Sequence, residues 1–141
     1  MHVYLYPCIR ARPTPLSRAT DNFFRMEREE AIDLLRRYVT LQSHIVHSHA
    51  TAAIMRKVAE HLGEDAEMWE IIGLLHDIDY DLVEGEMERH GIEGYRILIE
   101  NGVPENVAEI VRRHNHLLTS GYERPIEVAL QAADSASGLI I

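Results

Sequence analysis

From residue 27 onward, the sequence consists of segments whose apolar residues recur at helical spacing, separated by turn-forming residues. Such spacing places the apolar side chains on one face of an α-helix. The first segment carries Ile32, Leu35 and Val39 in this pattern, with glutamates in the first turn, where the helix dipole favours acids. No alternating strand pattern of useful length occurs. We therefore predict an all-α fold, a compact bundle of about five to six helices.

Glycine and proline residues indicate where these helices begin and end. Gly63 is a natural stop for one helix, Asn101-Gly102 ends another, and Pro104 can occupy the first turn of the next. The predicted helices are residues 27–40, 43–62, 65–76, 88 or 90 to 100, 104–116, and 125 onward, with loops at 77–86 (polar and acidic) and 117–124.

The first 25 residues differ from the rest of the chain. They contain three prolines and show no helical period, which predicts an irregular N-terminal arm before a single domain over residues 26–141. Because Met26 begins the helical part, we hypothesise that translation naturally starts there; an intact mass beginning at Met1 would contradict this. The apolar end of the sequence leaves open whether the fold lacks a C-terminal portion or docks on a partner.

The charge balance narrows the classes of ligand. Lys and Arg number 14 against 23 Asp and Glu, a formal net charge of −9, which argues against a general nucleic-acid binder. A phosphorylated small molecule remains compatible, because bound metal ions can supply positive charge locally. Cys8 is the only cysteine, and no apolar run approaches the roughly 20 residues that span a bilayer. We expect a cytoplasmic protein with a phosphorylated small-molecule substrate, no nucleic-acid or membrane partner, and homo-oligomerisation left open.

The nine histidines are a high number for this length, and several of them accompany carboxylates. Imidazole nitrogens and carboxylate oxygens that converge from several elements are typical ligands of divalent transition metals. The pair His76-Asp77 follows an apolar helix, although a helix-end histidine with a capping aspartate would explain the dipeptide alone. Asp134 is more informative, because it lies among alanines on an apolar helix face, where a carboxylate is costly unless it is paired or metal-bound.

Taken together, these residues follow the order H…HD…H…HN…D on successive predicted helices. This order resembles the HD superfamily of metal-dependent phosphohydrolases, and in particular its small HDIG-type predicted hydrolases. The resemblance covers roughly residues 27–141. The stretches that carry it are HSHATAAIMR (47–56), GLLHDID (73–79), HGIEGY (90–95), RHN (113–115) and AADSASGLI (132–140).

The resemblance implies a metal site on specific residues of this chain. The four positions that match the ligands of one metal throughout the superfamily are His47, His76, Asp77 and Asp134. His90 and His114 match the additional histidines of the subgroups that hold two metals, in which the aspartate of the HD pair bridges. It therefore implies one or two divalent ions, with Fe, Mn, Mg, Zn, Ni and Co not distinguishable, and a catalytic role for Asp77. His49 should point elsewhere, and His116 should lie at the surface or behind the ligands.

Some positions depart from the HDIG-type pattern or have no settled role. Asp79 replaces the usual glycine, and it could equally belong to a solvated acidic loop or support a ligand. Tyr80 replaces a lysine that is often assigned to phosphate contact. Arg113, or its neighbour Arg112, could bind the substrate phosphate instead. We expect the remaining histidines to be solvated surface residues: His2, His44 and His61.

The activity that this resemblance implies is hydrolysis of a nucleotide or another small phosphoester through a metal-activated water. The GYP motif of the subgroup that acts on cyclic dinucleotides is absent, which lowers that option. Two alternatives stay open. Some HD-fold proteins use the same six ligands to hold two irons and activate dioxygen, and a degenerate HD domain could bind a ligand or partner without catalysis.

Overall fold

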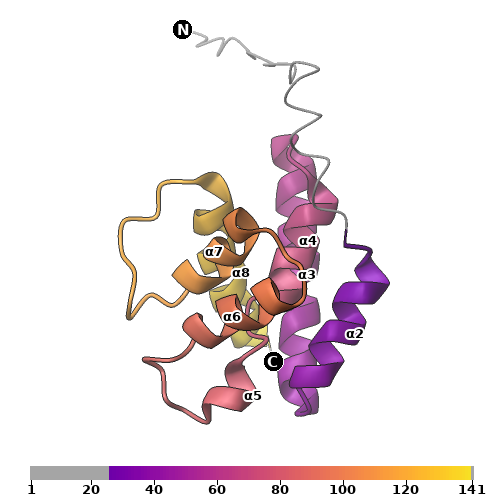
Figure 1. Cartoon of the computed structure of the whole chain (residues 1–141). Helices are drawn as coiled ribbons and strands as arrows, with labels where there is room; N and C mark the ends of the chain where they lie inside the picture. Colours follow the sequence, from indigo (N-terminus) through magenta and orange to yellow (C-terminus); the bar gives the residue numbers. More distant parts are fainter. Residues whose placement is uncertain (1–25, 141) are drawn as a thin grey trace, which may run out of the picture.

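A computed structural model describes residues 26–140 of the chain (Figure 1). The arm predicted for residues 1–25 lies outside the described residues, as does Ile141. Within the described part all regular elements are helices, which confirms the predicted all-α fold. No helix there is both long and apolar enough to cross a membrane. The helices are α2 (Arg28–Tyr38), α3 (Gln42–Leu62), α4 (Ala66–Leu75), α5 (Tyr80–Val83), α6 (Ile92–Glu100), α7 (Glu105–Arg113) and α8 (Pro125–Ile140).

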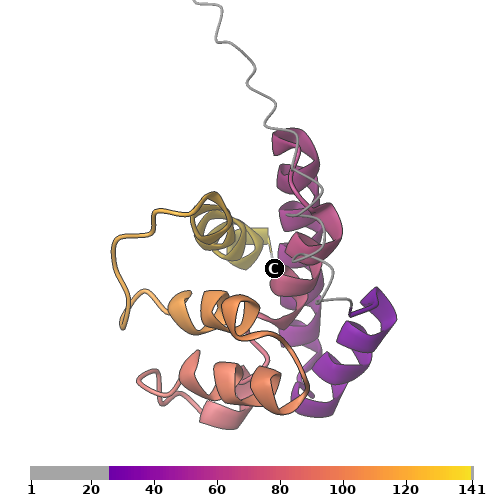
Figure 2. The ribbon, with the colours of Figure 1, turned by 45° about the horizontal axis from the view of Figure 1, so that its top comes forward.

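The centre of the fold is α4, a mostly apolar helix that carries one buried charge, Glu70. Every residue from Trp69 to Leu75 is buried, and α3 packs along most of this helix. In Figures 1 and 2, α2 lies on one side of the α3–α4 pair, whereas α6, α7 and α8 lie on the other. The backbones of α3 and α4 approach closely at Gly73, where a Cβ atom would lie 2.7 Å from the Cα of Ala52 on α3.

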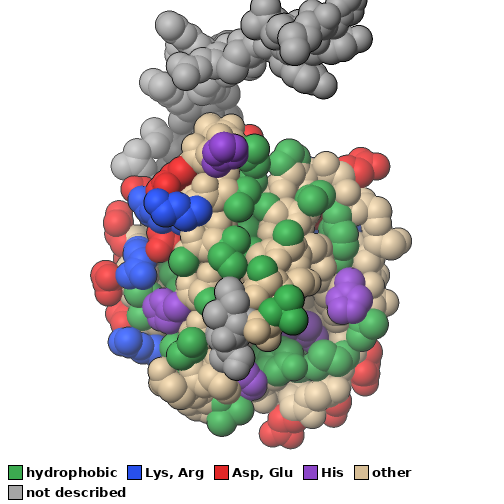
Figure 3. Space-filling model, turned by 180° about the vertical axis from the view of Figure 1, so that it is seen from behind, with side chains coloured by type: hydrophobic (Ala, Val, Ile, Leu, Met, Phe, Trp, Pro, Cys, Tyr) green, Lys and Arg blue, Asp and Glu red, His purple; other side chains and the backbone are tan. Residues whose placement is uncertain are grey.

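A buried carboxylate also ties three helices together. Glu70 of α4 pairs with Arg28 of α2 at 2.8 Å and with Arg56 of α3 at 2.6 Å. Its side chain is only 10% exposed, so both arginines compensate the loss of hydration of the charge. Seen from behind (Figure 3), most charged side chains lie toward the rim and apolar side chains are spread over the middle of the face, while histidines are seen at several separate places.

The structure differs from the sequence prediction between α4 and α6. The predicted loop 77–86 contains the one-turn helix α5, whose Val83 is fully buried. The next helix begins at Ile92, later than predicted, because residues 87–91 form turns that end at Gly91. Gly91 has φ of +87°, and a Cβ there would lie 2.7 Å from the Arg112 carbonyl oxygen, so only glycine suits this approach to α7.

The contact at Gly73 gives a prediction for stability. Alanine favours helix over glycine, yet Gly73→Ala should lower the free energy of unfolding by about 1–3 kcal/mol, because the added methyl overlaps the α3 backbone. Urea denaturation measures the change. The control is Gly138→Ala on α8, where a Cβ meets no atom within 4 Å and should cost nothing. Equal effects of the two substitutions would contradict the close packing of α3 on α4.

Candidate metal centre

Six side chains from five parts of the chain converge beside the C-terminal end of α4. His47 extends from the first half of α3 and Asp134 from the middle of α8. The other four follow or precede helix ends: His76 and Asp77 after α4, His90 before α6, and His114 after α7. They form two groups whose potential ligand atoms lie within 4.8 Å of one another, the first His47, His76, Asp77 and Asp134, and the second Asp77, His90 and His114. All six predicted ligand positions are therefore brought together.

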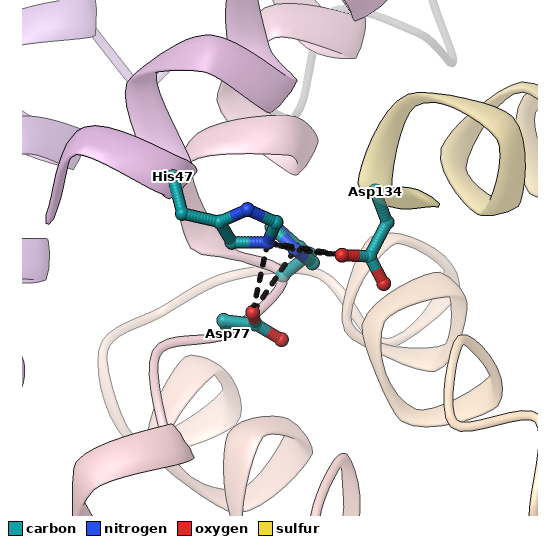
Figure 4. Close-up of side chains that lie close together, drawn as sticks. His47, Asp77 and Asp134 are labelled. Carbon is teal, nitrogen blue, oxygen red and sulfur yellow. Dashed lines mark hydrogen bonds and ion pairs between the residues drawn. The ribbon is translucent and has the colours of Figure 1, made fainter. Parts of the chain in front are cut away.

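The first group is built around the Nε2 atoms of two histidines. His47 Nε2 lies 2.9 Å from Asp134 Oδ1 and 3.2 Å from Asp77 Oδ2. His76 Nε2 lies 3.2 Å from His47 Nε2 and 3.2 Å from the same oxygen of Asp77. Figure 4 shows His47 and Asp134 reaching toward one another from α3 and α8, with Asp77 below them. Two nitrogens and two carboxylates thus face one point.

The second group uses the other oxygen of Asp77. Its Oδ1 lies 3.2 Å from His90 Nε2 and 3.2 Å from His114 Nε2. Each oxygen of this one carboxylate therefore faces two imidazoles of a different group. A carboxylate placed in this way can bridge two cations.

The opposite edges of three of these imidazoles are fixed by hydrogen bonds. Nδ1 of His76 donates to the Gly73 carbonyl at 2.7 Å, and Nδ1 of His114 donates to the Val111 carbonyl at 2.5 Å. Both acceptors lie three residues earlier, in the last turn of a helix, where carbonyls lack the usual backbone partner four residues on. A neutral histidine with its proton on Nδ1 has a lone pair on Nε2. The lone pairs of these two rings therefore point into the space that the ligand atoms of each group surround. Converging lone pairs and carboxylates fit a metal cation.

Asp79 supports the third ring. It is fully buried, and its Oδ1 accepts from His90 Nδ1 at 2.7 Å. Its Oδ2 accepts from the backbone N–H groups of Gly91 and Gly94 at 2.7 and 2.8 Å. The sequence left a solvated acidic loop and a supporting role equally open for Asp79. Its burial excludes the first, and a carboxylate behind a histidine orients that ring for metal binding.

In the absence of metal, the electrostatics of the site favour protons on His47 and His90. Hydrogen bonds to Asp134 and Asp77 raise the pKa of His47 to about 9. Burial acts to lower the pKa of His90, but hydrogen bonds to Asp77 and Asp79 raise it to about 9. Burial acts to raise the pKa of Asp77, but the histidines around it hold that pKa well below its usual range. Cations must displace these protons, so metal binding releases protons.

A cavity of about 400 Å³ opens onto both groups. Tyr80, Met87 and Leu117 form part of its wall, together with His44 and the exposed His116. No lysine or arginine is among the described residues that line it. The cavity is therefore suited to a small ligand whose negative charge is neutralised by bound cations rather than by basic side chains.

The arginines that the sequence suggested for phosphate binding lie elsewhere. Arg113 pairs with Glu127 of α8 at 2.6 Å, and Arg112 pairs with Glu109 at 2.5 Å. Both line a different hollow of about 360 Å³, formed with Ile92 and residues 118–120. A phosphate contact by Arg113 therefore stays a prediction, because its side chain lines that hollow and not the cavity beside the two groups.

Sequence reasoning missed several residues that shape the site. The expectation that His44 is a solvated surface residue was wrong, because its Nδ1 pairs with Asp81 and its ring lines the cavity. The sequence indicates no role for Asn115 beyond its place in the RHN stretch, yet its amide donates to the carbonyls of Met87 and His90 at 2.7 and 3.0 Å. These pairs join segments far apart in the sequence, and no local pattern reveals them. His61 is exposed as expected, whereas His2 lies outside the described residues.

The raised histidine pKa values predict how stability varies with pH in metal-free protein. The folded-state pKa of His47 and His90 is about 9, above the usual value near 6.5, so their protonation stabilises the fold fully below about pH 6.5. This contribution should be lost as the pH rises toward 9. Urea denaturation in a chelator at pH 6.5 and 9.5 measures it, with His47→Gln as the control that should fall less. An equal or larger fall in the variant would contradict the assignment.

Comparison with known proteins adds one finding. The model of the HD domain family matches residues 45–138, which is more than half of the chain and includes all six converging side chains. Neither the comparison with curated proteins nor that with solved structures returned a significant match. The matched region contains the HD pair itself, His76-Asp77, at the end of its central helix. The chain belongs to the HD domain family.

Proposed function

We propose that this protein is a metal-dependent phosphohydrolase that acts on a nucleotide or another small phosphoester. The observation that carries the proposal is the position of Asp77, whose two oxygens each lie 3.2 Å from two histidine nitrogens of separate groups. Membership of the HD domain family supports the same class of activity. The arrangement is suited to two divalent cations rather than one.

The residues divide between the two proposed cations. His47, His76 and Asp134 would hold one, His90 and His114 the other, and Asp77 would contact both. Divalent ions bound there would lower the pKa of a coordinated water and neutralise charge on the phosphoryl oxygens. Asp77 would keep the two cations at a fixed separation, and its second role would be to orient the attacking water. Asp79, the Gly73 carbonyl and the Val111 carbonyl would keep the imidazoles aligned.

The cavity supports a small substrate. Its volume of about 400 Å³ lies within the usual range for small-molecule sites. Apolar atoms of Met87 and Leu117 offer a surface to the organic part of a phosphoester, and the cations would receive its phosphate. Arg113 does not line this cavity, so it would contribute only if its side chain changed position.

The division of ligands predicts metal stoichiometry. After loading with Mn²⁺ and dialysis, the wild-type protein should retain about two ions per chain, since each group offers nitrogen and carboxylate ligands. His90→Ala should retain about one, because the first group keeps all its members, and Asp77→Asn should retain less than His90→Ala. Mass-spectrometric metal analysis provides the count, with His61→Gln as the control. Equal loading of wild type and His90→Ala would remove the second cation from the proposal.

The proposed activity predicts phosphate release from a panel of nucleotides and phosphomonoesters in the presence of Mn²⁺ or Mg²⁺. Removal of metal with a chelator, His76→Ala or Asp77→Asn should each abolish turnover, because each removes the means of activating water. Turnover that requires two irons and dioxygen would instead indicate the oxygenase alternative. A protein that binds no metal, and whose stability His76→Ala leaves unchanged, would indicate a non-catalytic domain.

A further inference from the structure

His44 lies beside the proposed ligands but is not one of them. It is one helical turn before His47 on α3, so both side chains project from the same face of that helix. Its ring lines the same cavity. The ring of Tyr80 lies between His44 and His90, edge-on to both, with centroid distances of 4.8 and 5.4 Å. His44 therefore borders the metal centre without joining either group.

Asp81 holds the ring of His44 in one orientation. Nδ1 of His44 donates to Asp81 Oδ1. Oδ2 of the same carboxylate accepts from the backbone N–H groups of Thr40 and Leu41 at 2.8 and 3.2 Å, which fixes Asp81 against the start of α3. Within residues 26–140, Nε2 of His44 has no hydrogen-bond partner, and the side chain is 30% exposed. Nε2 is therefore the nitrogen that a ligand in the cavity can reach.

Hydrolysis of a phosphoester with a basic leaving group needs a proton donor as well as an activated water. The departing oxygen gains negative charge as its bond to phosphorus breaks, and a positioned acid that protonates it accelerates the reaction. The Nε2 and carboxylate atoms of the six ligand positions face one another, so they are engaged in the metal centre. His44 has a free nitrogen at the edge of that centre and a carboxylate behind it, an arrangement that orients catalytic histidines.

We propose that His44 donates the proton to the leaving oxygen of the substrate, and that Asp81 is the positioning residue for its ring. This inference rests on the proposed phosphohydrolase function. A hydroxide oxygen forms the new bond to phosphorus while the bond from phosphorus to the leaving oxygen breaks. The electron pair of that bond takes the proton from Nε2, which leaves an alcohol, inorganic phosphate and a neutral imidazole. The imidazole regains its proton from solvent, and Nδ1–H stays on Asp81 throughout.

A purely structural role for the pair would have a different consequence. Asp81 accepts backbone hydrogen bonds that satisfy the start of α3, so its loss can weaken the fold whatever His44 does. A structural role would reduce turnover of all substrates alike. A proton donor is needed only when the leaving group is basic, so its loss must depend on the leaving group.

The test compares phenyl phosphate with 4-nitrophenyl phosphate, which share an aryl phosphate core but differ in leaving-group basicity. His44→Gln in the Mn²⁺-loaded enzyme should lower kcat for phenyl phosphate by about 100-fold or more. The loss of kcat for 4-nitrophenyl phosphate should be smaller by a factor of about 10. Asp81→Asn should change the ratio in the same direction by a smaller factor. His61→Gln, on the exposed far end of α3, is the matched control and should leave both rates unchanged.

Equal losses on the two substrates would overturn the role of His44, whereas a wild-type enzyme inactive on every phosphoester would overturn the proposed function as well. A second readout does not depend on turnover. In ¹⁵N-histidine NMR spectra of Zn²⁺-loaded protein, His44 should carry a proton on Nδ1, and Asp81→Asn should shift its tautomer balance. A wild-type His44 with its neutral-form proton on Nε2 would contradict the hydrogen bond to Asp81 and so the proposal.

Discussion

The arrangement of the site depends on one carboxylate, that of Asp77. It is 9% exposed, and its two oxygens face four imidazoles carried by α3, the end of α4, the turn before α6 and the end of α7. Burying a carboxylate among imidazoles is costly unless protons or cations balance the charges. In metal-free protein the raised histidine pKa values show protons in that role. Metal cations in the same place would balance the negative charge of the carboxylates through coordination bonds.

The packing of α4 brings these groups to one point. Its mostly apolar surface lets other helices surround it, and Gly73 lets α3 approach one turn before His76. The same turn supplies the Gly73 carbonyl that accepts a hydrogen bond from His76 and orients its ring. At the end of α7, the Val111 carbonyl does the same for His114. Helix ends thus provide both the position of a ligand and the acceptor that fixes its tautomer. This explains why most of the proposed ligands lie at helix ends.

Much of this could be predicted from the sequence, and what could not has a physical reason. Long helices show a clear period of apolar residues in the sequence, so α3 and α8 begin at or within one residue of their predicted starts. The four-residue helix α5 is too short to show such a period. The ligand positions were predicted from the resemblance to the HD superfamily, which rests on the order of histidines and aspartates along the chain. The pairs His44–Asp81 and Arg113–Glu127 could not be predicted, because both depend on which helix faces reach one another after folding. Asp79 stayed ambiguous until its burial was known.

The central claim is that Asp77 lies between two adjacent cations. Electron paramagnetic resonance of the Mn²⁺-loaded protein tests it most directly, because two Mn²⁺ ions that share a carboxylate are magnetically coupled. Two bound ions per chain with the spectrum of a coupled pair are expected, and Asp77→Asn should abolish that spectrum. The six-line spectrum of isolated Mn²⁺ at full loading of the wild-type protein would contradict the shared site.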